Sequence, residues 1–176
     1  NGLISQAISL HYEQGIPVGR IEDIYGINHG SLFSVLDRMA YWLKPVVALL
    51  ILQLRDESVI HADETGWRTD GRSGYAWLFC SVRTSIFKFA NTRSATIPHE
   101  ILGNKRLKAC LVRDRYAGYN RIQCRQQYCY AHLLRDVEDL EKEFEGNIEV
   151  TDFANKMATL LSDAMKLRGR DLSDKA

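Results

Sequence analysis

The chain has 176 residues, of which 45% are hydrophobic and 26% are charged, and its formal net charge is +1 at pH 7. This composition is typical of a globular protein with one domain and a smaller addition, and bulk charge gives no sign of a nucleic-acid partner. The longest apolar run, residues 46–52, is too short to cross a bilayer, so no membrane partner is expected. The four cysteines form no C-x-x-C pair and follow no signal peptide, which predicts a reduced, cytoplasmic protein, associated with the nucleoid if it acts on DNA.

The first part of the chain, residues 1–57, carries a helical pattern and is predicted to bind DNA. Its apolar residues recur at helical spacing from Leu3 onward, and Gly15-Ile16-Pro17 should end the first helix. A further apolar helix is expected from Pro45 to Leu54.

Residues 18–38 resemble a helix-turn-helix. Gly26 would make the turn, and Asn28 or Ser31 would cap the second helix. The inward-facing residues would be Ile21, Ile24, Tyr25, Leu32, Val35 and Leu36. The second helix would present to a DNA groove the side chains of His29, Ser31, Ser34, Asp37 and Arg38. This set has little positive charge, and a plain helical hairpin is the alternative.

Residues 58–146 show strand patterns interspersed with helical ones. The predicted strands are 59–62, 74–82, 85–90, 108–112 and 127–131, and the predicted helices are 94–102, 116–121 and 132–144. The resulting order, β-β-β-α-β-α-β-α, is that of the α/β ribonuclease H-like fold, with a mixed sheet and helices on its faces. Residues 147–176 hold another amphipathic helix, at 150–168, and are predicted to begin a helical insertion or C-terminal extension.

Two aspartates, Asp63 and Asp114, end apolar runs where a buried strand would meet a loop. In a ribonuclease H-like fold the first and fourth strands are neighbours, so these two carboxylates would lie side by side. Adjacent carboxylates repel each other unless a cation neutralises them. Mg²⁺ does so with few protein ligands and leaves positions for water and phosphate oxygens, which is what phosphodiester chemistry requires. A strand-end cap or turn is the alternative role for either residue alone.

A basic segment surrounds Asp114 in the sequence. Between residues 105 and 125 there are seven basic residues against one acid. The candidates for phosphate contacts are Lys105, Arg106, Lys108, Arg113, Arg115 and Arg121, together with Arg68 after the first aspartate. Tyr116 and Tyr119 could stack on unpaired bases or pack beneath a loop. A solvated face is the alternative for the basic segment.

Several blocks, in order, resemble the DDE transposases of the bacterial insertion-sequence family numbered sixty-six. The blocks are His-Ala-Asp-Glu-Thr-Gly-Trp-Arg from His61, Asp70-Gly71, Tyr-Ala-Trp-Leu-Phe from Tyr75, Arg93-Ser94 before a helix ending in Leu102-Gly103, Val-Arg-Asp-Arg-Tyr-Ala-Gly-Tyr from Val112, and Cys-Tyr-Ala-His-Leu-Leu-Arg-Asp from Cys129. The resemblance implies DNA strand cleavage and strand transfer at element ends. It implies that Asp63 and Asp114 are the first two catalytic acids and bind Mg²⁺ or Mn²⁺, with two ions in the complete enzyme. It also implies that element ends and target DNA are the partners and that the active assembly is a homo-oligomer.

The chain departs from the family pattern at two places. The family usually has Gly after its second Asp, where this chain has Arg115. The third acid of the family, a Glu, lies beyond the last strand after a helical insertion, and no residue here is assigned to it. The chain starts in mid-pattern, so we expect a piece of a longer protein, and activity of this piece alone is in question.

Cys129 and His132 match a C-x-x-H pair found after the second Asp in several transposase families, and they are expected to lie near the active site. A zinc site, with Cys124 and His61 as further ligands, is the alternative. For the whole chain, two other functions remain open: a non-catalytic DNA-binding remnant or regulator, and a ribonuclease H-like nuclease or resolvase.

Overall fold

The computed structural model describes residues 2–167, which divide into two compact units between Leu52 and Gln53. The last residues of the predicted C-terminal extension, 168–176, lie outside the described part, and so does the end of the helix predicted at 150–168. Among residues 2–167, no helix is both long enough and apolar enough to cross a membrane.

The N-terminal unit is helical. It contains α1 (Gly2–Ile8), a π-helical turn η1 (Ser9–Glu13), α2 (Val18–Tyr25) and the beginning of α3 (His29–Arg55). Its small core is formed by Ala7, Ile21 and Leu32. Gly26 ends α2 in the left-handed conformation, at φ 64°, and its N–H donates to the carbonyl of Glu22.

The turn between α2 and α3 is closed by side chains. Asn28 caps α3, because its side-chain oxygen accepts a hydrogen bond from the Gly30 N–H at 2.9 Å. Glu22 adds a second acceptor for this helix end, since its carboxylate lies 3.3 Å from the His29 backbone nitrogen and 3.1 Å from the His29 ring. Two helices joined by a turn at Gly26 are therefore present, whereas the helix-turn-helix assignment and a use in DNA binding stay predictions.

Two expectations for this unit are wrong. Ile24 is 60% exposed and does not face the core. The helix expected to start at Pro45 is not separate, since α3 runs unbroken through this proline to Arg55. A proline removes one backbone hydrogen bond, and this loss alone does not oblige a helix to stop.

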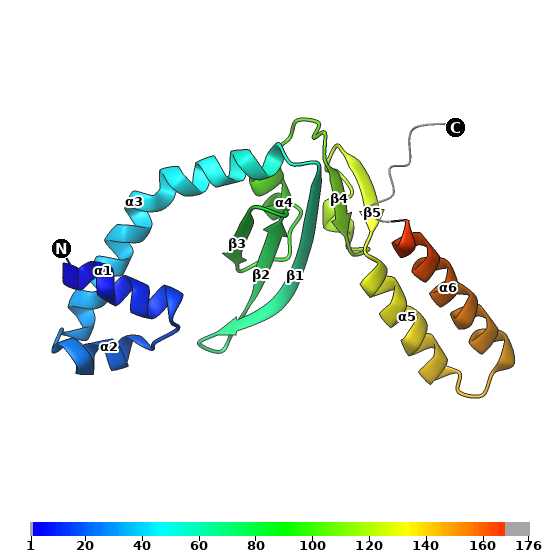
Figure 1. The fold of residues 1–176 in the computed structure, drawn as a ribbon, viewed down its shortest axis with the longest axis horizontal. Coiled ribbons are helices and arrows are strands. Elements are labelled where there is room, and N and C mark those ends of the chain that lie inside the picture. The colour runs from blue at the N-terminus through cyan, green and yellow to red at the C-terminus, as the bar shows by residue number, and fades with distance from the viewer. Residues whose placement is uncertain (1, 168–176) are drawn as a thin grey trace. The chain divides into compact units, whose positions relative to one another are not determined.

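The second unit is built on a five-stranded sheet. Its strands are β1 (Val59–Thr69), β2 (Arg72–Cys80), β3 (Ser85–Ala90), β4 (Cys110–Arg113) and β5 (Arg125–Tyr128). They lie in the order β3-β2-β1-β4-β5 (Figure 1). The β1–β2 and β2–β3 pairs are antiparallel, and the β1–β4 and β4–β5 pairs are parallel. This order and these directions are those of the ribonuclease H-like fold predicted from the sequence.

Helices connect and extend the sheet. They are α4 (Thr96–Leu102), a 3-10 turn η2 (Ala117–Tyr119), α5 (Tyr130–Glu143) and α6 (Ile148–Lys166). Alternation along β1 and β2 puts the fully buried Ile60, Trp77 and Phe79 on one sheet face, and Ile101 and Leu102 of α4 are buried as well. Helices α5 and α6 run side by side as a hairpin, and Asn147 caps the second of them (Figure 1).

Strand β1 is longer than predicted. The expected strand ended at Ala62, but β1 continues to Thr69 because every residue from His61 to Thr69 pairs with β2. The hairpin closes through Asp70 and Gly71, whose positive φ angles of 51° and 75° are those of a type I′ turn. Asp63 therefore lies within a strand and not in a loop, although the pairing of β1 with β4 ends at His61, just before it.

The last strand is shifted relative to the prediction. It was expected at 127–131 but occupies Arg125–Tyr128, where it forms an exposed edge. Cys129 already serves as the N-cap residue of α5, so the apolar residues after it begin a helix.

Candidate active site

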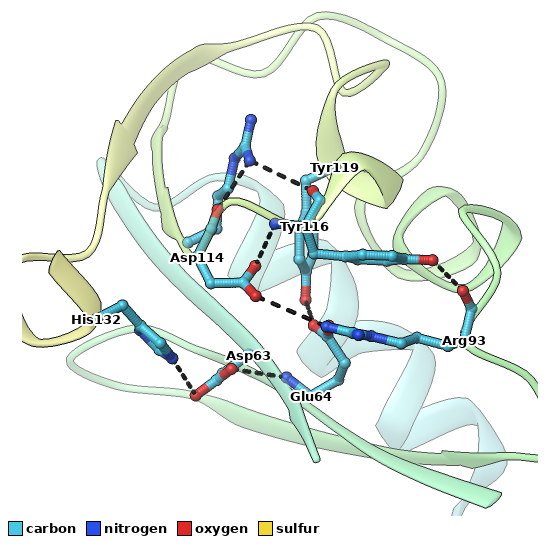
Figure 2. Close-up of polar contacts among 8 residues, drawn as sticks. Asp63, Glu64, Arg93, Asp114, Tyr116, Tyr119 and His132 are labelled. Carbon is cyan, nitrogen blue, oxygen red and sulfur yellow. Dashed lines mark hydrogen bonds and ion pairs between the residues drawn. The ribbon is translucent and has the colours of Figure 1, made fainter. Parts of the chain in front are cut away.

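The register of the parallel strands brings Asp63 and Asp114 to the same place. Val59, Ile60 and His61 of β1 pair with Cys110, Leu111 and Val112 of β4. Continued for two more residues, this register sets Asp63 level with Asp114, which directly follows β4. Figure 2 shows the two carboxylates on neighbouring segments of the chain. Asp63 and Asp114 are called the carboxylate pair below.

Each member of the carboxylate pair is held by a local hydrogen bond. Asp63 Oδ1 accepts from the Glu64 N–H at 3.0 Å, and Asp114 Oδ1 accepts from the Tyr116 N–H at 3.0 Å. The second oxygens remain accessible to other partners: Asp63 Oδ2 lies 3.9 Å from His132 Nε2, and Asp114 Oδ2 lies 3.8 Å from Arg93 Nη2. Neither distance is a hydrogen bond. The Asp63 side chain is 55% exposed and that of Asp114 is 19% exposed, so solvent reaches both.

A second group of side chains lies next to Asp114, and we call it the Arg93 cluster: Arg93, Glu64, Tyr116 and Tyr119. The Glu64 carboxylate is only 1% exposed. Its Oε1 accepts from Arg93 Nε at 2.9 Å and Nη2 at 2.6 Å, and its Oε2 accepts from the Tyr119 hydroxyl at 2.5 Å. The Arg93 guanidinium also lies 4.2 Å from the centre of the Tyr116 ring, whose hydroxyl donates to the Arg93 carbonyl (Figure 2).

Burial and hydrogen bonds change the pKa values of the ionisable side chains in the Arg93 cluster. Burial raises the pKa of the Glu64 carboxyl above its ordinary value, while hydrogen bonds from Tyr119 and Arg93 act in the opposite direction. Burial and the hydrogen bond to Glu64 raise the pKa of Tyr119 far above its ordinary value, so this hydroxyl stays a donor. The hydrogen bond to Glu64 likewise raises the pKa of Arg93.

The Arg93 cluster is not among the sites that the sequence pattern predicts. Glu64 directly follows Asp63, but alternation along β1 turns its side chain to the opposite face, where it is paired in register with buried Trp77. An acid on the core face of a strand is a signal that could have identified it. Arg93 gave no such signal, because it lies in the loop before α4.

The carboxylate pair fits a divalent cation only in part. Two carboxylates with solvent access suit Mg²⁺ or Mn²⁺, which keep several water or phosphate ligands. Within residues 2–167, however, no three His, Cys, Asp or Glu side chains are close enough together to hold a metal ion. Glu64, the acid that follows Asp63, is already bound by Arg93 and Tyr119. A third protein ligand is therefore not supplied by the described residues.

Cys129 and His132 lie at the start of α5. The His132 Nε2 atom faces Asp63, and its Nδ1 atom is buried without a hydrogen-bond partner among the described residues. Cys129 is a free thiol. The zinc alternative, with Cys124 and His61, has no support, because it too needs a cluster that residues 2–167 do not form.

Several basic residues that lie near Asp114 in the sequence are separated from it in space by the length of β4. Lys105, Arg106 and Lys108 precede this strand, whereas Asp114 follows it, so they lie at opposite ends. Arg106, Lys108 and Arg125 line a groove of about 410 Å³ with Leu107. The segment thus does not surround Asp114 in space as it does in the sequence.

One of the predicted DNA contacts is wrong. Arg113 is 4% exposed, since alternation along β4 places it on the buried face. Tyr119 is fully buried, which agrees with the alternative that it packs beneath a loop. Arg115 is exposed, but its guanidinium pairs with Asp136 on α5 and not with the carboxylate pair. The remaining candidates are exposed: Arg68, Lys105, Arg106, Lys108 and Arg121 in this unit, and His29, Ser31 and Arg38 on α3.

Comparison with known proteins places the chain in a family. The pattern of the Transposase IS66 family matches residues 1–173. No curated protein matches the chain. One similar solved structure is the HTLV-2 integrase catalytic core domain in complex with magnesium, with 10% identity, a TM-score of 0.29, and coverage of 56% of this chain and 80% of that chain.

Another similar structure is the simian T-cell lymphotropic virus intasome in complex with PP2A regulatory subunit B56 gamma. It has 8% identity, a TM-score of 0.34, and coverage of 84% of this chain and 66% of that chain. Because both TM-scores are low, the assignment of the fold rests on the strand order and directions described above. The family match extends over nearly the whole sequence, and on that ground the chain belongs to the IS66 family of transposases.

Proposed function

We propose that this chain carries the catalytic core of a metal-dependent transposase that cuts DNA at element ends and joins the freed ends to target DNA. The observation that supports this most is the strand register, which sets Asp63 level with Asp114 where β4 ends. Two accessible carboxylates on neighbouring segments are a site for a divalent cation and a phosphate oxygen.

The roles of the residues follow from their positions. Asp63 and Asp114 would hold Mg²⁺ or Mn²⁺, with two ions in the complete enzyme. Such ions supply Lewis-acid activation of the attacking hydroxyl and stabilisation of the leaving oxygen. The Glu64 and Tyr116 N–H groups orient the two carboxylates through one oxygen each and leave the other oxygen free for a ligand.

The same proposal names the partners. Exposed basic residues beside the sheet and on α3 would contact phosphates of element ends and target DNA, which would make binding weaken as salt rises. Transposition needs two ends held together, so we also propose a homo-oligomeric assembly.

A second candidate function is a DNA-binding remnant without catalysis. It is favoured by one observation, that no third acidic ligand joins the carboxylate pair within residues 2–167. The remnant would bind DNA equally well with or without metal.

A cleavage assay separates these functions. The purified protein is incubated with supercoiled plasmid DNA carrying the element ends, in Mg²⁺, in Mn²⁺ or in EDTA. The proposal predicts nicked and joined products in either metal and none in EDTA. Cleavage without joining would point instead to a nuclease or resolvase, and unaltered plasmid under all conditions, with DNA binding retained, would point to the remnant.

A further inference from the structure

Glu64 is a buried acid that the proposed chemistry leaves unused. An ionised carboxylate at 1% exposure is costly unless it is paired and hydrogen-bonded. The Arg93 cluster meets this requirement, because Arg93 bonds one oxygen of Glu64 and Tyr119 bonds the other. Glu64 is therefore fixed, and it fixes Arg93 in turn.

Contacts hold the Arg93 side chain in place but do not occupy all of its hydrogen-bond donors. Glu64 takes its Nε and Nη2 donors, and the Tyr116 ring lies beneath its guanidinium at 4.2 Å. Within residues 2–167, its Nη1 group has no hydrogen-bond acceptor, and the side chain is 44% exposed. The free part of the guanidinium is thus open to solvent at the edge that carries Asp114, whose Oδ2 is 3.8 Å from Nη2.

We propose that Arg93 binds a DNA phosphate at the carboxylate pair and that Glu64 is the positioning residue that holds Arg93 there. This inference rests on the proposed function and adds to it a residue that contacts the substrate. Asp63, Asp114 and Glu64 together repel an approaching phosphodiester, and a fixed guanidinium offsets part of that repulsion. Arginine suits this role because its planar donors match phosphate oxygens. Because its side chain is already oriented, little conformational entropy is lost on binding.

The position of Arg93 beside Asp114 distinguishes phosphate binding from a role in which Arg93 would only neutralise Glu64. The ion pair between Arg83 and Glu57 offers the comparison, since Glu57 is also largely buried and Arg83 is also exposed. That pair has no catalytic carboxylate within ion-pair distance. Arg93 pairs with Glu64 and reaches Asp114 as well.

The test measures phosphate contacts without metal. Binding of a 20-base-pair duplex is followed by fluorescence anisotropy in EDTA over a range of KCl concentrations. Arg93→Gln should reduce the slope of log affinity against log salt by about 0.9, the loss of one phosphate contact. The double variant Glu64→Gln with Arg93→Gln should show the same reduction, and it leaves no unpaired buried charge that could unfold the chain. Arg83→Gln, the matched control, should keep the wild-type slope.

Two further variants distinguish the phosphate contact of Arg93 from the positioning of Arg93 by Glu64. Arg93→Lys keeps the charge and should keep the slope, but it should lower cleavage by roughly 10²-fold because the planar donors are lost. Glu64→Gln should likewise keep the slope and lower cleavage roughly 10- to 100-fold, because Arg93 is no longer held. An unchanged slope in both Arg93→Gln and the double variant would overturn the phosphate role, and normal cleavage by Glu64→Gln would overturn the positioning role.

A failure of the proposed function would appear in a different measurement from a failure of the role of Arg93. In that case Asp63→Asn would leave any cleavage unchanged, whereas the salt slopes at Arg93 would still report whether this residue contacts phosphate.

Discussion

Replacing Asp63 or Asp114 by Asn should lower strand cleavage at least about 10³-fold while leaving DNA affinity within about twofold of wild type. Each substitution removes a negative charge from the carboxylate pair and therefore weakens the cation site. It should not disturb the fold, since an Asn oxygen can still accept the local hydrogen bond that each Asp accepts from a backbone N–H. The measurement is a single-turnover cleavage assay in Mg²⁺, paired with a DNA-binding titration in EDTA.

Asp139→Asn is the matched control for this experiment. Asp139 is an exposed aspartate on α5 whose ion-pair partner among residues 2–167 is Lys142, so its substitution should change neither cleavage nor binding. Full cleavage by Asp63→Asn or Asp114→Asn would show that the carboxylate pair is not the catalytic site.

Replacing Arg113 by Ala should destabilise the second unit by about 3 kcal/mol or more. Arg113 donates five hydrogen bonds, to Gln126 twice, to Asn120, and to the carbonyls of Asp114 and Tyr116. It thus joins β4 to β5 and to the segment that carries Asp114. The substitution leaves these acceptors without their donor, and it also removes the stacking of Arg113 on Tyr128.

Chemical denaturation, followed by circular dichroism, measures the effect. Arg115→Ala is the control two positions along, where an exposed arginine pairs with an exposed aspartate and substitution should change the free energy of unfolding by no more than about 0.5 kcal/mol. Equal stabilities for the two variants would show that the hydrogen bonds of Arg113 do not hold this edge of the sheet together.

The sequence was sufficient to predict the fold and the proximity of Asp63 and Asp114 on neighbouring segments, although not that Asp63 lies within a strand. Short apolar strands and their order determine the ribonuclease H-like sheet, and alternation along β1 and β4 places Asp63 and Asp114 on the same edge. The extension of β1 to Thr69 was not predicted, because its polar residues become a strand only through their pairing with β2.

The surroundings of the pair depend on contacts between distant parts of the chain. Glu64 and Arg93 are 29 positions apart, and nothing local in the sequence links them. Arg113 was interpreted as a phosphate contact because it lies in a basic segment, but alternation along β4 puts it on the same buried face as Leu111. The separation of Lys105, Arg106 and Lys108 from Asp114 likewise follows from the direction of β4 and not from their closeness in the sequence.

The central claim is that folding brings Asp63 and Asp114 together to share one divalent cation. A titration with Mn²⁺, observed by ¹H–¹⁵N NMR, tests it directly, because the paramagnetic ion broadens the signals of nearby amides. Broadening is expected to begin at residues 63, 64, 114 and 116 and to disappear in both Asp63→Asn and Asp114→Asn. Broadening centred elsewhere, or unchanged in the two variants, would contradict it.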